Sequence, residues 1–246
     1  MPCINDVLPT ELLDQILESY FHQTEDYRFS VMAADRSTYT GANALLACRE
    51  WRQIGTPHLY ESVELRSSTQ TAALARTFRK KPQLASRVKL LHVEGAFGPA
   101  LGEIGELCAA SVECLSLSLD VRGEDLQGYE RMLAKLSPRH VTILGDSEGF
   151  TVWEPIVAVL CRSIKRWDRL EYFAFSSSTD ADEYGAQGDA PGTELEYSPE
   201  LCKALATRAT LRTVCLNGDL IDGVFALSKP ILSLLSSETA PVSRLV

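Results

Sequence analysis

Apolar residues near the start of the chain recur at the spacing of an α-helix. In the segment LPTELLDQILESYF they form one stripe, made of Leu12, Leu13, Ile16, Leu17, Tyr20 and Phe21. Pro9 suits the first helical turn, where a backbone N–H is not needed. The pattern fails over residues 23–41, which predicts an excursion loop, and resumes after Asn43, a good N-cap. A second helix is therefore predicted over about residues 44–54, ending at a glycine and Pro57.

Beyond residue 60 a short strand motif of the form apolar-x-x-apolar-x-apolar recurs six times. It begins at Tyr60, Val88, Val112, Pro138, Leu170 and Leu211, and Pro138 is the one key position that does not count as apolar. The central positions of the motif are 63, 91, 115, 141, 173 and 214, which are 28, 24, 26, 32 and 41 residues apart. Leucine-rich repeats run to about 20–29 residues, so the first three steps fit and the last two need insertions.

Helix-like stretches lie between these strand motifs, over residues 69–81, 99–110, 124–136, 153–167, 199–209 and 229–235. A strand-then-helix unit that repeats predicts a solenoid, because one unit cannot bury its own apolar face. We therefore predict an α/β fold, in which a helical unit at 1–60 precedes a curved leucine-rich-repeat-like solenoid at 61–246. Its strands would form a parallel inner face and its helices the outer face.

Two segments of the predicted solenoid depart from the repeat. Residues 176–198 hold six acidic residues and no Lys or Arg, which predicts a flexible acidic loop. Residues 244–246 resemble the opening of a further strand motif. Either they pack as a terminal strand, or the chain is a truncated form of a longer one.

Composition narrows the functional classes. The chain is 45% hydrophobic and 23% charged, near globular averages, and no run approaches the ~20 apolar residues of a membrane span. A net charge of −9 disfavours general nucleic-acid binding, because phosphate backbones repel an acidic chain. Seven scattered cysteines indicate reduced thiols, and the first residues carry no basic leader, so we expect a location in the cytoplasm or nucleus.

Enzyme and metal-site motifs are missing from the sequence. There is no G-x-S-x-G elbow, no Walker-type loop, no G-x-G-x-x-G, no H-E-x-x-H and no C-x-x-C. The four histidines are far apart in the sequence, and the acidic residues at 180–183 lack the ligand spacing of an EF-hand. We predict no catalytic residue, no metal site and no cofactor.

The two N-terminal segments resemble the F-box. LPTELLDQI follows its pattern Leu-Pro-x-Glu-Leu-Leu-x-x-Ile, and LLACREWR carries its Cys-x-x-Trp-Arg helix. The continuation TPHLYESVELRSSTQ, and VECLSLSLDV further on, look like fungal F-box proteins with a divergent leucine-rich-repeat body. The resemblance extends to about Asp146. Two features depart from it, since Ala47 stands where the family usually has Val and the loop at 23–41 is longer than in a compact F-box.

This resemblance implies a substrate-receptor subunit of a Skp-cullin-F-box ubiquitin ligase, which has no active site of its own. The positions that match the surface docking on the Skp adaptor are Leu8, Pro9, Leu12, Leu13, Ile16, Leu45, Cys48 and Trp51. A two-helix unit of about fifty residues cannot bury two apolar stripes by itself, which favours a partner. The alternative is that the helices only cap the solenoid, and that the protein is a ligase-independent scaffold for protein–protein binding.

Target binding is predicted on the inner face, where the residues between the apolar ones of each strand motif point. The candidate target-binding residues are Glu64, His92, Ser116, Thr142, Ala174 and Cys215, followed by Arg66, Glu94, Ser118, Ser176 and Asn217. The row is mixed in charge and small at its centre, which suits a protein segment better than nucleic acid or a membrane. Alternatively these are ordinary solvated side chains, and the target contacts the acidic loop or repeats beyond Val246.

Overall fold

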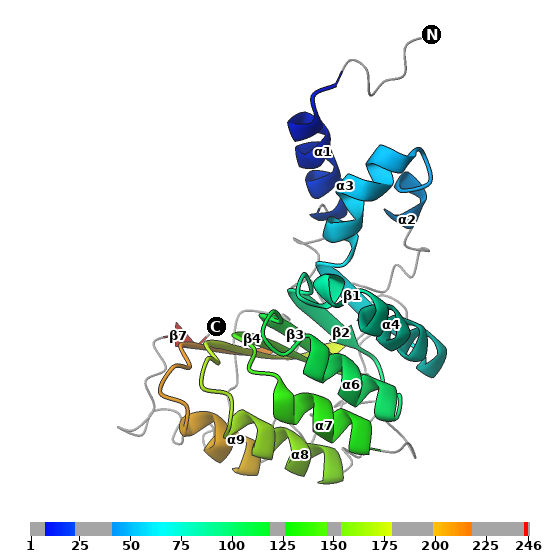
Figure 1. Cartoon of the computed structure of the whole chain (residues 1–246). Helices are drawn as coiled ribbons and strands as arrows, with labels where there is room; N and C mark the ends of the chain where they lie inside the picture. The colour runs from blue at the N-terminus through cyan, green and yellow to red at the C-terminus, as the bar shows by residue number, and fades with distance from the viewer. Residues whose placement is uncertain are drawn as a thin grey trace, which may run out of the picture.

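A single parallel sheet organises most of the chain (Figure 1). The computed structural model describes residues 8–22, 41–118, 126–146, 154–178, 199–217 and 244–245. Seven strands lie side by side in sequence order: β1 (Ser62–Leu65), β2 (Leu90–Val93), β3 (Cys114–Ser118), β4 (His140–Asp146), β5 (Tyr172–Ser178), β6 (Thr213–Asn217) and β7 (Arg244–Leu245). Each strand pairs with the next in parallel.

The strand register follows the repeat found in the sequence. The central apolar residues of the six strand motifs, Val63, Leu91, Leu115, Val141, Phe173 and Val214, are register partners in successive strands. Leu245 continues the row beside Val214, so the residues near the end of the chain form a terminal strand. The predicted parallel sheet is confirmed.

Helices follow the strands and cover one face of the sheet (Figure 1). They are α4 (Ser68–Lys80), α5 (Pro82–Ala85), α6 (Pro99–Leu107), α7 (Gln127–Lys135), α8 (Glu154–Ile164) and α9 (Pro199–Ala206). Helix α5 was not predicted; it is a single turn that begins at Pro82, the proline predicted to end the preceding helix. The predicted acidic loop begins too early, because Ser176–Ser178 extend β5. Its remainder and the predicted helix at 229–235 lie outside the described residues.

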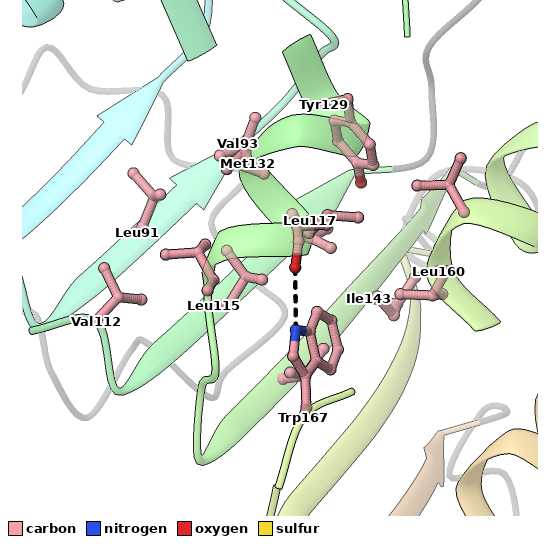
Figure 2. Packing of buried hydrophobic residues seen from close by; sticks show 14 of the residues in the cluster. Leu91, Val93, Val112, Leu115, Leu117, Tyr129, Met132, Ile143, Leu160 and Trp167 are labelled. Carbon is pink, nitrogen blue, oxygen red and sulfur yellow. Dashed lines mark hydrogen bonds between the residues drawn. The ribbon is translucent and has the colours of Figure 1, made fainter. Parts of the chain in front are cut away.

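The main core lies between the sheet and these helices. Along each strand the alternate apolar residues point towards the helices, and the largest side chains buried there are Phe78, Tyr129, Trp167 and Phe173. Trp167 spans two repeats, since its indole Nε1 donates a hydrogen bond of 3.2 Å to the carbonyl oxygen of Leu133 (Figure 2). Stacked repeats therefore bury the apolar face that a single repeat would expose.

Ion pairs join neighbouring helices across the outer layer. Arg79 of α4 pairs with Glu103 of α6, Arg131 of α7 with Glu106 of α6, and Arg162 of α8 with Glu130 of α7. Each pair is exposed, so each contributes little to stability, about 0–1 kcal/mol. Such a pair recurs from one repeat to the next and so links neighbouring repeats in the outer layer.

Within the part of the chain that the structure describes, no helix is long and apolar enough to cross a membrane.

The N-terminal unit contains α1 (Thr10–His22), α2 (Gly41–Ala44) and α3 (Arg49–Leu59). The single helix predicted over 44–54 is wrong in its bounds. Cys48, rather than Asn43, caps α3, because its Sγ accepts a hydrogen bond of 3.4 Å from the backbone N–H of Trp51. The helix continues through Pro57 to Leu59. Tertiary contact explains Gly55 within it, since a Cβ there would lie 2.6 Å from Leu45 Cδ2.

A second, smaller core holds this unit together. Leu13, Leu17 and Phe21 of α1 are buried together with Leu45, and Trp51, Ile54 and Leu59 of α3 pack against them. The unit meets the sheet at Tyr60 and Glu61. The Tyr60 ring lies 5.9 Å from that of Phe78, and the buried Glu61 carboxylate accepts a hydrogen bond of 2.9 Å from Lys89 Nζ.

The close approach of α6 and α7 generates a stability prediction. A Cβ at Gly105 would lie 2.6 Å from the Met132 Cα, which is backbone, whereas one at Gly102 would meet the flexible side chain of Arg131 at 2.9 Å. Gly105→Ala should lower the free energy of unfolding by about 1–3 kcal/mol through overpacking. Gly102→Ala in the same helix should leave the free energy of unfolding nearly unchanged. A helix prefers Ala over Gly by about 1 kcal/mol, which offsets the cost of displacing the Arg131 side chain. Urea unfolding of both variants measures the difference, and equal stabilities would contradict this packing.

Candidate functional site

Among the described residues of the N-terminal unit, four large apolar side chains are exposed. Leu12, Ile16 and Tyr20 of α1 are 47%, 49% and 43% exposed, and Leu46, in the turn after α2, is 79% exposed. Leu12, Ile16 and Tyr20 are four residues apart and therefore share one helix face, which we call the α1 stripe. The neighbouring residues Leu13, Leu17 and Phe21 form the buried face. Helix α1 is thus apolar on two sides, of which the unit buries one.

The eight residues predicted to bind the Skp adaptor divide into three groups by burial. Pro9, Leu12 and Ile16 are exposed, and Leu8, Cys48 and Trp51 are half-buried. Leu13 and Leu45 are buried in the core of the unit. A partner cannot reach them unless the unit opens, so we assign them to that core.

Sequence reasoning left Tyr20 and Leu46 out of the candidate surface. The signal for Tyr20 was present, because apolar residues occur in adjacent pairs, at 12 and 13, 16 and 17, and 20 and 21. Such pairs make a stripe wider than one packed face requires. Nothing in the pattern distinguishes Leu46 from its buried neighbour Leu45.

The predicted target-binding row lies along the inner face, the sheet face opposite the helices. Glu64, His92, Ser116, Thr142, Ala174 and Cys215 are register partners in successive strands. Ser118, Ser176 and Asn217 lie in a second row two residues further along, and Arg66 and Glu94 follow the ends of β1 and β2. Ser116 and Thr142 are half-buried, but Ala174 is only 7% exposed and offers little contact area.

Four polar side chains gather where the row meets β1 and β2, and we call them the polar quartet: Glu64, Arg66, His92 and Glu94. Arg66 Nε lies 2.7 Å from Glu64 Oε1 and 3.3 Å from Glu94 Oε1. Burial opposes the charge of Arg66, but hydrogen bonding and attraction from the two carboxylates outweigh it and raise the pKa of the guanidinium. Glu64, His92 and Glu94 offer three metal-ligand atoms within 4.8 Å of one another. They come from two strand motifs, so a motif search within one segment cannot find them.

One row back, a thiol, an imidazole and a phenol lie side by side on the inner face. Cys114, His140 and Tyr172 are register partners. Cys114 Sγ is 3.4 Å from His140 Nδ1, and the rings of His140 and Tyr172 meet edge to face at 5.9 Å. Burial raises the pKa of Tyr172, as does its hydrogen bond with Cys215. Cys114 and His140 were not predicted as site residues, although they occupy equivalent positions of successive motifs.

Comparison with known proteins identifies no family for this chain. A scan against protein-family models finds no match for the chain, and searches of curated proteins and of solved structures find none either.

The environment of His140 generates a titration prediction. Burial lowers its pKa, the positive charge of Arg139 lowers it further, and Glu171 and Glu113 oppose these effects. The imidazole should titrate below an ordinary histidine. Because the unfolded chain then binds the proton more readily, this group should lower stability as pH falls below the usual histidine pKa of about 6.5. NMR titration of the ring protons measures the midpoint.

Arg139→Gln tests the cause of this shift. It removes a nearby positive charge and leaves Glu171 without a bidentate partner, so the midpoint of His140 should rise. Arg162→Gln removes an arginine that pairs with Glu130 in the helical layer and should leave the midpoint unchanged. A wild-type midpoint at or above the ordinary value, or a fall in Arg139→Gln, would contradict the assignment.

Proposed function

We propose that this protein is a substrate-receptor subunit of a Skp-cullin-F-box type ubiquitin ligase. Its N-terminal unit docks on the Skp adaptor, and through the adaptor on a cullin, while the leucine-rich-repeat-like body binds a target protein. The observation that carries the proposal is the α1 stripe, an exposed apolar helix face in a segment whose residues resemble an F-box. The protein contributes recognition, and the other subunits of the ligase carry out the chemistry in the cytoplasm or nucleus.

The energetics of the α1 stripe support a protein partner. Fully burying a large aliphatic or aromatic side chain stabilises a complex by about 1.5–3 kcal/mol. Leu12, Ile16 and Tyr20 leave between 43% and 49% of their surface unburied, so a large part of that gain is available to a partner. An amphipathic helix that places residues four apart into an apolar groove is a common mode of recognition.

The competing function is a ligase-independent scaffold whose N-terminal helices only cap the solenoid. Helix α3 leads directly into β1, which fits a cap. Helix α1 fits a cap less well, because its buried face packs in the second core with Leu45 and α3, apart from the main core of the sheet. Its other face, the α1 stripe, is exposed. Capping therefore accounts for α3 and leaves the stripe on α1 unexplained.

Co-expression with the Skp adaptor tests the docking. The double variant Leu12→Ser, Ile16→Ser should fold like the wild type, because both side chains are exposed, and should bind the adaptor at least about tenfold more weakly. Glu18→Ser, an exposed change in the same helix, is the matched control and should bind normally. Retained binding in the double variant, or a folded wild type that does not bind the adaptor, would favour the scaffold.

Leu13→Ala separates docking from folding. Leu13 is 2% exposed in the core of the unit, so its truncation should lower the stability of the unit by about 2–5 kcal/mol. Adaptor binding should then fall together with the thermal midpoint. Unchanged stability with lost binding would instead place Leu13 at the interface.

The target-binding role of the inner face has its own test. Ser116→Arg with Thr142→Arg places two long cations on the row while leaving the N-terminal unit untouched, so adaptor binding should persist. Ala134→Arg with Ala158→Arg adds the same charge to exposed positions of α7 and α8 as a control. Proximity labelling should lose specific partners only in the first pair. An unchanged set of labelled proteins would exclude the inner face as the recognition surface.

A further inference from the structure

The polar quartet forms a two-by-two grid at the β1 end of the inner face. Glu64 and Arg66 are two residues apart along the first strand motif, and His92 and Glu94 are two apart along the second, so all four side chains project to the same side. Glu64 is the register partner of His92. Beyond β2, the backbone N–H of Glu94 donates a hydrogen bond of 2.9 Å to the carbonyl oxygen of Leu65. The backbone positions of the grid are therefore fixed by the sheet.

Three of the four side chains have the spacing of metal ligands. His92 Nε2 lies 3.4 Å from Glu94 Oε1 and 3.9 Å from Glu64 Oε1. In a tetrahedral zinc site with bonds of about 2.0–2.2 Å, ligand atoms are about 3.3–3.6 Å apart. The imidazole and Glu94 already have this separation. Small rotations of two flexible glutamates would bring all three atoms to one ion.

Burial differs among the ligands in a way that suits binding from solution. The His92 side chain is 16% exposed, so its surroundings restrict the ring, whereas the Glu64 and Glu94 side chains are 39% and 38% exposed. An imidazole with two carboxylates favours zinc and related transition metals, because calcium and magnesium prefer oxygen ligands alone. Three protein ligands leave a fourth position for water.

The carboxylates already hold a cation, the guanidinium of Arg66. Arg66 Nη2 is 2.5 Å from Glu64 Oε1, and Nε is 3.3 Å from Glu94 Oε1, so one side chain bridges both acids. Arg66 supplies one positive charge to the two carboxylates, whereas a divalent ion would supply two. The Arg66 side chain is 39% exposed on a long stem and has room to swing into solvent.

We infer that Glu64, His92 and Glu94 bind a divalent transition-metal ion of the zinc class, and that Arg66 is the internal cation that competes with it. The ion would lie on the inner face, at the β1 end of the row proposed to contact the target, because Glu64 and His92 belong to that row. The site does not depend on adaptor docking, so either proposal can fail without the other.

Titration of the metal-stripped full chain with Co²⁺ tests the site, because tetrahedral cobalt gives strong visible absorption and Zn²⁺ should displace it. One equivalent should bind. Glu64→Gln and His92→Gln should each weaken binding at least about tenfold, since even the partners of metal ligands contribute 10- to 100-fold. Glu64→Gln alters an exposed side chain, so it remains informative if His92→Gln fails to fold.

Arg66→Gln gives the opposite sign. Removing the competing cation should tighten metal binding about two- to fivefold, as expected for an exposed ion pair. Arg131→Gln is the matched control, because Arg131 also pairs with a glutamate, Glu106, in the helical layer and should have no effect. Cys114→Ser and His140→Gln should bind cobalt like the wild type, which would exclude binding at the neighbouring thiol and imidazole.

Four results would overturn the inference. They are no cobalt spectrum with millimolar Co²⁺, wild-type affinity in both ligand variants, loss of binding in Cys114→Ser, and weaker binding in Arg66→Gln.

Discussion

Each strand from β2 to β6 is positioned by one backbone carbonyl of the strand motif before it. The carbonyl oxygen of Glu61 accepts hydrogen bonds from the N–H groups of both Lys89 and Leu90, each at 2.9 Å. The same double acceptance recurs at the carbonyls of Lys89, Glu113, Arg139 and Glu171. All five residues stand two positions before the central apolar residue of their motif. A slip of one residue would break this contact and turn every buried side chain to the wrong face, so the core and the inner face depend on it.

The side chains at these positions reinforce the same order of repeats. Their charges alternate in sign along the sheet, through Glu61, Lys89, Glu113, Arg139, Glu171 and Arg212. Lys89 Nζ binds the Glu61 carboxylate at 2.9 Å, and Arg139 Nη2 binds both oxygens of Glu171 at 3.0 and 3.1 Å. Exposed pairs contribute little, but Glu61 is buried and would be costly to leave unpaired. Skipping one repeat would place like charges together, so the alternation opposes mispairing.

The sequence was sufficient to predict the strands, because the same apolar-x-x-apolar-x-apolar motif recurs in each repeat. It was insufficient where tertiary packing overrides a local signal. Gly55 and Pro57 indicate a helix end, yet α3 continues through both. Gly55 stands inside the helix because a Cβ there would lie 2.6 Å from Leu45 Cδ2. The buried and exposed faces of α1 are equally apolar in sequence, and only the position of α3 decides that Leu13 is inside and Leu12 outside. The polar quartet could not be predicted from a single segment, because it depends on the strand register that places Glu64 beside His92.

The two candidate surfaces are linked by polar contacts on both sides of the end of α3. His58 Nε2 lies 2.8 Å from Asp14 Oδ1 of α1, and Glu61, three residues later, binds Lys89 beside β2. The α1 stripe and the inner face are therefore connected through a short, hydrogen-bonded joint rather than through a free linker. Under the proposed function, the body would have to hold its target at a set distance from the rest of the ligase, since transfer requires the reacting groups to meet. A joint of this kind would convert docking of the N-terminal unit into a fixed direction for the repeat body, which a flexible tether could not provide.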